Sequence, residues 1–286
     1  MLETTFFENH RVRVGYRLVE NPHCSGNRCA VLLHGAGVGG VETFAPMYEY
    51  FTEWRWMLIP DLTGMGETTF LHGQEAPITI EQLSEDLEDL LDALMWEKFD
   101  LLGYSLGGLV ALHLNARRGC SEANLILLEP ASLDRASLED LLDVRRRYRK
   151  AAEIIRQTGD VEQGIALFMD SVSPNRRKNP RVEEKTQSRL AHRPHGFAYA
   201  LDAVTAWVEQ AAQGQAMREQ LIDSAKNVLL FSGAISHQGL IDHYQALADE
   251  RLEWHHINLK GCDHSLPFQK PRQIAIHVNR WLVEKK

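Results

Sequence analysis

Short apolar runs without alternation recur along the chain. They occupy residues 30–33, 56–60, 99–103, 125–128 and 228–231, and residues 254–259 are also strand-like. A continuous apolar run of this length is typical of a strand that is buried on both faces of a sheet. Two further strands are predicted at residues 4–7 and 12–18, joined around Asn9, a turn-prone residue.

Other segments have a helical period. Residues 79–96 place apolar side chains three or four positions apart with acidic side chains between them, which predicts an amphipathic helix. Thr79 and Gln82 have the spacing of a capping box at its start. Residues 106–117 and a segment that opens at Pro271 are further predicted helices. Strands that alternate with helices predict an α/β fold with a doubly wound, mostly parallel sheet.

This alternation breaks once, between about residues 132 and 225. The apolar pattern there is helical without a convincing strand, and Pro174, Pro180 and Pro194 interrupt it. We interpret an all-helical insertion between two strands of such a core as a lid. The predicted organisation is a first core part at 1–131, a helical lid at 132–225 and a second core part at 226–286.

Composition narrows the functional class. The chain has 286 residues, 44% of them hydrophobic, so it can bury a large core. Its net charge of −8 argues against a dedicated nucleic-acid binder, which needs a basic face. We expect no signal peptide, because the N-terminus lacks a basic and an apolar region, and no membrane span, because no apolar run approaches ~20 residues. The four cysteines show no metal or disulfide spacing, which favours a cytoplasmic location.

The strongest chemical signal is a serine between a predicted strand and a predicted helix. It is Ser105 in Gly103-Tyr104-Ser105-Leu106-Gly107, a G-x-S-x-G pattern. On such a sharp turn the serine hydroxyl stands at the helix N-terminus, where N–H groups and the helix dipole favour developing negative charge. We predict that Ser105 is a nucleophile.

Two more loops after predicted strands carry candidate chemistry. Residues 34–37 read His-Gly-Ala-Gly, and His264 follows the strand at 254–259. A histidine in that loop suits a general base, which must come within hydrogen-bond reach of the serine. Cys262, Asp263 and His264 are too close in sequence to converge on one ion, so no metal is predicted.

In this order, these motifs resemble the α/β-hydrolase superfamily, in its serine hydrolase type with a helical lid. The resemblance covers about residues 6–131 and 227–282. It implies that Ser105 lies on the nucleophile elbow. It also implies that the backbone N–H groups of Ala36 and Leu106 form the oxyanion hole. The loop that begins at Asp61 resembles the D-x-x-G-x-G-x-S loop of the family, and we expect it to be structural.

One position departs from the family pattern. The triad acid usually follows the strand after the lid as Gly-x-x-Asp, but Ser236 stands at that position here. Disabling the acid lowers the rate roughly 10⁴-fold, so a substitute is expected. Our first choice is Glu129, at the end of the strand before the lid, because certain haloalkane dehalogenases place their acid after that strand. Asp242, or no acid at all, is the alternative.

The predicted function is that of a carboxylesterase or thioesterase that forms an acyl-enzyme with a small-molecule acyl substrate. One alternative is a carbon–carbon bond hydrolase or lyase with the same serine and histidine, since residues 103–108 also resemble menaquinone-pathway lyases. Another is a non-catalytic ligand-binding member, which the missing aspartate favours. No cofactor is predicted, because the glycines of residues 35–40 lack an acidic ribose partner about twenty residues on. The sequence does not determine the oligomeric state, and a homodimer is one possibility.

The predicted lid supplies candidates for the substrate pocket. Its large apolar side chains are Phe168, Met169, Phe197, Tyr199 and Trp207, most of which we expect to pack the lid itself. Two basic clusters, at residues 145–150 and 176–181, would either attract an anionic substrate or form solvated helix faces. His192 and His195 are further candidates for the pocket.

Overall fold

The computed structural model describes residues 2–24, 26–120, 122–214 and 216–285. The predicted core and lid ranges also contain residues 1, 25, 121, 215 and 286, which lie outside this description. Within it, nine strands form one sheet in the order β1-β2-β4-β3-β6-β7-β8-β9, with β5 paired to β2. Neighbouring strands are parallel from β4 across to β9, and β2 pairs antiparallel with β1, β4 and β5. The predicted mostly parallel α/β sheet is thus confirmed.

The strands lie where the apolar runs predict them. Their bounds are β1 Thr5–Glu8, β2 Val12–Glu20, β3 Cys29–Leu33, β4 Trp56–Pro60, β5 Thr69–Phe70, β6 Asp100–Tyr104, β7 Asn124–Leu128, β8 Asn227–Gly233 and β9 Trp254–Leu259. All residues of β6 and β7 are buried, as expected for central strands covered on both faces. Asn9 forms the predicted turn, because its side-chain oxygen accepts hydrogen bonds from the N–H groups of Arg11 and Val12.

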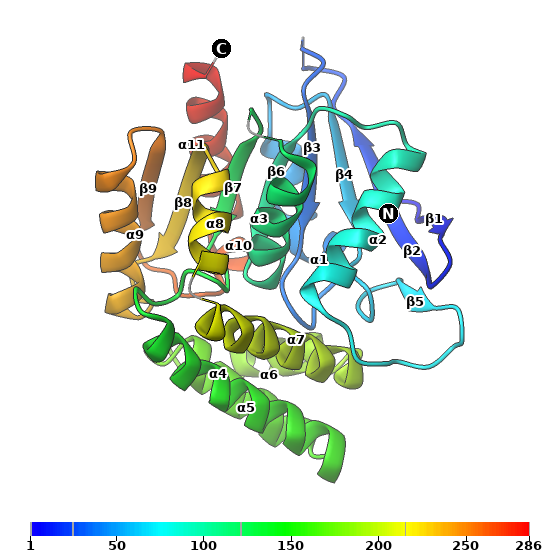
Figure 1. Cartoon of the computed structure of the whole chain (residues 1–286), viewed down its shortest axis with the longest axis vertical. Helices are drawn as coiled ribbons and strands as arrows, with labels where there is room; N and C mark the ends of the chain where they lie inside the picture. The colour runs from blue at the N-terminus through cyan, green and yellow to red at the C-terminus, as the bar shows by residue number, and fades with distance from the viewer. Residues whose placement is uncertain (1, 25, 121, 215, 286) are drawn as a thin grey trace.

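Helices cover both faces of the sheet (Figure 1). The core helices are α1 Gly40–Phe44, α2 Ile80–Ala93, α3 Leu106–Arg118, α9 Gln238–Glu250, α10 Leu266–Gln269 and α11 Pro271–Glu284, with a 3₁₀ turn at Tyr48–Tyr50. Helix α2 begins with the predicted capping box of Thr79 and Gln82. The sequence patterns did not predict α1, α9, α10 or β5, which are short or have few regularly spaced apolar positions.

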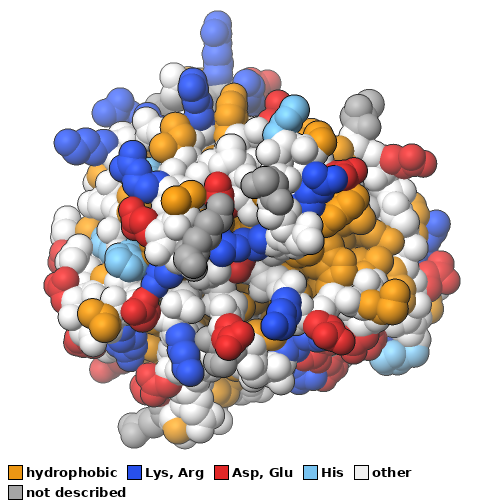
Figure 2. Space-filling view, turned by 90° about the horizontal axis from the view of Figure 1, so that it is seen from above, with side chains coloured by type: hydrophobic (Ala, Val, Ile, Leu, Met, Phe, Trp, Pro, Cys, Tyr) orange, Lys and Arg blue, Asp and Glu red, His pale blue; other side chains and the backbone are white. Residues whose placement is uncertain are grey.

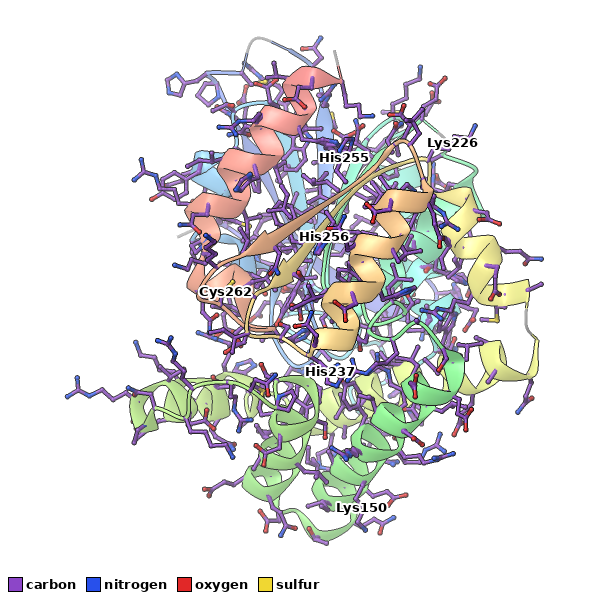
Figure 3. The ribbon with its side chains drawn as sticks, turned by 90° about the vertical axis from the view of Figure 1, so that its left-hand side faces the viewer. Lys150, Lys226, His237, His255, His256 and Cys262 are labelled. Atoms are coloured by element: carbon purple, nitrogen blue, oxygen red, sulfur yellow. The ribbon has the colours of Figure 1, made fainter. Side chains whose placement is uncertain are left out.

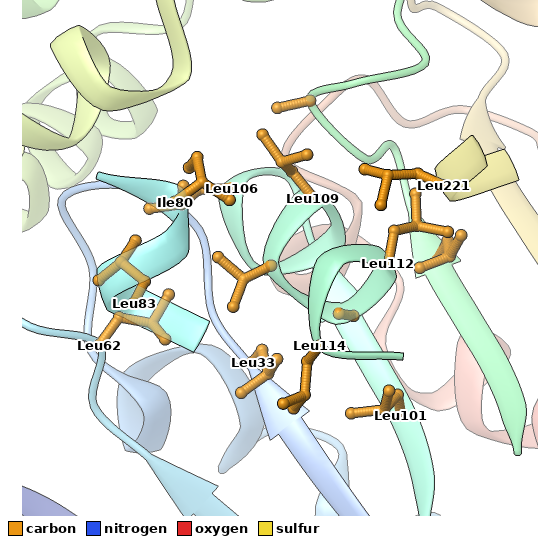
Figure 4. Packing of buried hydrophobic residues seen from close by; sticks show 14 of the residues in the cluster. Leu33, Leu62, Ile80, Leu83, Leu101, Leu106, Leu109, Leu112, Leu114 and Leu221 are labelled. Carbon is orange, nitrogen blue, oxygen red and sulfur yellow. The ribbon is translucent and has the colours of Figure 1, made fainter. Parts of the chain in front are cut away.

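Helix α3 is the central helix of one layer. Most of its side chains are buried, which is expected of a helix that is apolar on most sides. Figure 4 shows its leucines between Ile80 and Leu83 of α2 on one side and Leu221 of α8 on the other. Because α3 begins directly after Ser105, this packing also fixes the position of that residue.

The segment between β7 and β8 contains helices and no strand among its described residues. Its bounds are α4 Leu138–Glu153, a π-helical turn at Ile154–Thr158, α5 Val161–Val172, α6 Pro180–Leu190, α7 Pro194–Gln213 and α8 Ala216–Ser224. Helices α4 to α7 lie beyond the carboxyl ends of the parallel strands (Figure 1). We call residues 132–225 the helical insertion.

The opposite end of the molecule has a mixed surface. Figure 2, which views the face away from α4 to α7, shows acidic and basic side chains intermixed and a hydrophobic area at one side. Over the residues that the structure describes, no helix combines the length and apolar character needed to cross a membrane.

One contact between the helical insertion and the core combines a close backbone approach with the hydrogen bonds of an arginine. Gly196, at the start of α7, lies so near the carbonyl oxygen of Gly64 that a Cβ on Gly196 would overlap it. The adjacent Arg193 donates hydrogen bonds to the carbonyl oxygens of Gly66 and Thr68, at 3.1 and 2.6 Å. The start of α7 is therefore tied to the loop that follows β4.

This contact predicts a glycine requirement at residue 196. Gly196→Ala should lower the free energy of unfolding by about 1–3 kcal/mol, because the added methyl group forces the two backbones apart. The matched control is Gly214→Ala at the other end of α7, where the nearest atom is the carbonyl oxygen of Gln210 at 3.7 Å from the added Cβ. Urea denaturation of both variants measures the difference, and equal losses would contradict the prediction.

Candidate active site

Ser105 lies on a strained turn between β6 and α3. Its φ of 53° and ψ of −113° are unusual for a residue with a side chain. The turn is held by hydrogen bonds from Ser105 N–H to the carbonyl of Leu128 and from Ala131 N–H to the carbonyl of Ser105, both at 3.0 Å. A Cβ on Gly107 would overlap the backbone at Leu33, so only glycine permits this approach of helix and strand.

A chain of hydrogen bonds runs from Ser105 to Glu129 through His264. His264 Nε2 lies 3.2 Å from Ser105 Oγ, and His264 Nδ1 lies 2.8 Å from Glu129 Oε2. The Glu129 side chain is fully buried, and that of His264 is nearly so. The structure thus brings together the three residues that the sequence singled out as nucleophile, base and acid, in the geometry that triad chemistry requires.

Glu129 is fixed by the loop in which the family pattern expects an aspartate. Its second oxygen, Oε1, accepts hydrogen bonds from Gly233 N–H at 2.8 Å and from Ser236 Oγ at 2.6 Å. Ser236 therefore orients a carboxylate that arrives from the neighbouring strand. Asp242, the alternative acid, is exposed and accepts a hydrogen bond from Gln238 instead.

The pKa of His264 is raised above its usual value of 6.5. Burial by itself would lower this pKa, because it disfavours the charged imidazolium. The hydrogen bond and the negative charge of Glu129 act in the opposite direction and outweigh it. Glu129 thus stabilises the protonated form of His264.

The backbone N–H groups of Ala36 and Leu106, the two donors predicted for an oxyanion, have no hydrogen-bond acceptor among the described residues. Leu106 is the first residue of α3, so its N–H has no acceptor within the helix. For Ala36 N–H, the described part of the chain offers no hydrogen-bond acceptor. The loop of Ala36 is braced by His34, whose Nδ1 donates to the carbonyl of Gly35 and whose Nε2 accepts from Leu62 N–H. Burial lowers the pKa of His34, which keeps the ring neutral in this role.

Asp61 has the structural role that we expected. Its carboxylate accepts hydrogen bonds from Gly40 N–H at 2.6 Å and Glu67 N–H at 2.9 Å, and it forms a buried ion pair with Arg17. These contacts join the loop after β3 to the loop after β4. Asp61 is not among the described residues that line the cavity at Ser105.

Ser105 faces a cavity of about 40 Å³, most of it apolar. Its other lining residues are Gly35, Ala36, Val38, Tyr104, Phe168, Met169, Thr186, Arg189, Leu190, His264, Ser265 and Phe268. Of the predicted lining residues, Phe168 and Met169 are present. Phe197 packs behind them, with its ring edge-on to that of Phe168, and Trp207 is buried in the core below the insertion.

The remaining histidine and lid candidates lie elsewhere. His192 lines a groove beside the cavity, and His195 is exposed. Figure 3 shows three histidines that were not candidates: His255 and His256 on the edge strand β9, and His237 directly before α9. Within the described residues, no group of His, Cys, Asp and Glu side chains is arranged to hold a metal ion.

The sequence patterns did not single out Thr186, Arg189, Leu190 and Phe268. These residues come from α6 and α10, and they complete the cavity wall. A charged or polar residue on a short surface helix gives no signal of its own. Only the placement of α6 over Ser105 brings these side chains into the site.

A family model described as the alpha/beta hydrolase family matches residues 30–276. The chain belongs to the alpha/beta hydrolase family. Lipase LipV of Mycobacterium tuberculosis is 38% identical to this α/β hydrolase over an alignment of 225 residues. The match covers 76% of this chain and 79% of LipV.

Solved structures show the same fold over nearly the whole chain. A hydrolase from Pseudomonas aeruginosa has a TM-score of 0.73 at 20% identity and covers 98% of both chains. A thermophilic esterase from Thermogutta terrifontis has a TM-score of 0.73 at 19% identity, and the match covers 99% of this chain and 98% of the esterase. At this level of identity the likeness shows a common fold.

The contact with Glu129 predicts how His264 titrates. In the wild-type protein, the imidazole should titrate above pH 6.5, because Glu129 stabilises its protonated form. Glu129→Gln removes the negative charge and leaves the burial, so the pKa of His264 should fall below the wild-type value. Ser236→Ala is the matched control, since it removes a neighbour of Glu129 and keeps the charge. NMR titration of the His264 ring measures all three, and an unchanged pKa in Glu129→Gln would contradict the assignment.

Proposed function

We propose that this α/β hydrolase is a serine hydrolase that cleaves a carboxylic ester or a thioester through an acyl-enzyme. Ser105 is the nucleophile, His264 the general base and Glu129 the triad acid. Ser105 Oγ attacks the carbonyl carbon while His264 Nε2 takes its proton. The N–H groups of Ala36 and Leu106 bind the oxyanion of the tetrahedral intermediate. His264 then protonates the leaving alcohol or thiol, and a water molecule releases the acid by the same route.

The observation that carries this proposal is the continuous hydrogen-bond chain from Ser105 through His264 to Glu129. A serine is a weak nucleophile unless a base removes its proton, and the base needs an oriented ring. The 3.2 Å and 2.8 Å contacts supply both conditions. The relative named lipase and the structural neighbour named esterase agree with ester chemistry.

The non-catalytic alternative depended on a missing acid. Because Glu129 accepts a hydrogen bond from His264 Nδ1, that argument no longer favours it. The carbon–carbon hydrolase or lyase alternative uses the same serine and histidine. It differs from the proposal in its substrate, so turnover of simple esters separates the two.

The helical insertion acts as a lid in this proposal. The cavity beside Ser105 is small, about 40 Å³, so in this proposal part of its wall moves to admit an ester. Helix α6 is the part best suited to move, because Leu190 is the one buried side chain among its residues, all of which the structure describes. The substrate would then be enclosed between α6 and Ser105.

The nucleophile is tested by mass spectrometry after treatment with a fluorophosphonate. The wild-type protein should gain one covalent adduct, and Ser105→Ala should gain none and lose at least 10⁴-fold in ester hydrolysis, since the covalent step is removed. Ser265→Ala is the matched control, because Ser265 lines the same cavity. It should still be labelled. A folded wild-type protein that is neither labelled nor active on esters would overturn the proposal.

A further inference from the structure

The cavity above Ser105 contains one permanently charged side chain among its described lining residues, Arg189 of α6. Arg189 also lines a groove of about 960 Å³ between α6 and the loops that follow β3 and β4. It therefore lies between the small cavity at Ser105 and the larger groove. A substrate that extends from Ser105 into the groove would pass this guanidinium.

Two contacts hold Arg189 and leave most of its donors without a protein partner. Its Nε donates to Glu42 Oε1 at 2.9 Å, and its guanidinium carbon lies 4.0 Å from the ring centroid of Phe268. Throughout the described residues, no acceptor is found for its two terminal nitrogens. A guanidinium has five N–H donors, so four remain. A pre-oriented pair of terminal nitrogens is suited to the two oxygens of a carboxylate.

Three arginines of the basic clusters in the helical insertion differ from Arg189, because acidic side chains bind their terminal nitrogens. Both terminal nitrogens of Arg149 bind Glu209, at 2.6 and 2.8 Å. Arg176 binds Glu183 through Nε and Nη2, at 3.1 and 3.0 Å. Arg145 is fully buried and paired with Asp134. These three arginines therefore already use terminal nitrogens for acidic partners, which Arg189 does not. Arg181 of the second cluster and Lys185 also line the groove.

The position of Arg189 favours a direct contact with a substrate carboxylate over long-range electrostatic attraction by the whole protein. The chain carries a net charge of −8, so its overall field repels anions. That field is screened beyond roughly 10 Å at moderate salt, whereas a contact in a partly closed site is screened much less. Arg189 is only 24% exposed and lies against an aromatic ring, so a carboxylate bound to it would be partly removed from water.

We propose that Arg189 binds a free carboxylate of the substrate, so that the preferred substrate is an ester or thioester that also carries an acid group. This inference rests on the proposed hydrolase function. The carboxylate would lie at the groove end of the cavity, because the walls nearer Ser105 include Phe168, Met169 and Leu190 and offer no other cation. Arg189 is in this sense a specificity-determining residue.

The test compares matched ester pairs, with the acid on either side of the scissile bond. The first pair, monoethyl glutarate and ethyl pentanoate, differs in a free carboxylate on the acyl side. The second pair, 3-(butanoyloxy)propanoate and propyl butanoate, differs in a free carboxylate on the alcohol side. In at least one pair, the wild-type protein should prefer the charged ester by tenfold or more in kcat/KM. Arg189→Gln should lower kcat/KM for that ester at least tenfold more than for its neutral partner. Arg189→Lys, which keeps the charge without the planar fork, should give an intermediate preference.

Glu42→Gln distinguishes two roles of Arg189: binding the substrate carboxylate, and holding α6 against α1 through its ion pair with Glu42. It breaks the same ion pair but keeps the guanidinium, so the preference for the charged ester should persist. If Arg189 only fastened α6, both variants would change the charged and neutral esters by equal factors. That result, or the absence of any preference in both pairs, overturns the inference. Failure of the hydrolase proposal looks different, because then the wild-type protein would hydrolyse none of the four esters.

Discussion

The hydrogen bond between Glu129 and His264 is the contact on which the arrangement of the site depends. It joins the residue that follows β7 to the loop that follows β9, and so spans three neighbouring strands of the sheet. Because these strands are parallel, their carboxyl ends lie at one edge, where Ser105 also stands at the end of β6. The order of the strands thus places the three side chains within reach of one another.

A buried carboxylate is stable only if its oxygens are satisfied. Glu129 is 0% exposed and meets this condition through Gly233 N–H, the Ser236 hydroxyl and His264. In the register of β7 and β8, Leu128 lies opposite Phe231. The end of β7 is therefore beside the start of the loop that follows β8. A serine at residue 236 is therefore compatible with an acid supplied by the adjacent strand. Its hydroxyl binds the carboxylate of Glu129, which takes the place of the aspartate that the family pattern expects.

Much of this architecture could be predicted from local patterns. The apolar runs mark the central strands, and the glycines around Ser105 mark a turn whose geometry no larger residue allows. Glu129 could be chosen as the acid because it ends a strand next to the expected one. The fold and family are confirmed by the sheet and by the comparisons, while the catalytic roles remain our proposal.

Other features depend on contacts between distant segments and leave no local signal. The basic clusters of the insertion suggested an anion site, but acidic partners such as Glu209, sixty residues from Arg149, already bind several of their arginines. Arg189 gave no signal, because its importance comes from the position of α6 over Ser105 and from its contact with Phe268. Sequence patterns show which charges exist, and only the folded chain shows which of them are already paired.

The central claim is that Glu129 is the acid of a working triad. The most direct measurement is the rate constant of Ser105 acylation in Glu129→Gln, followed by stopped-flow with a chromogenic ester under single-turnover conditions. Our account predicts a fall of roughly 10³- to 10⁴-fold with the fold intact, because the imidazole loses its orienting charge. A rate within threefold of wild type would contradict it and would mean that His264 acts without an acid partner.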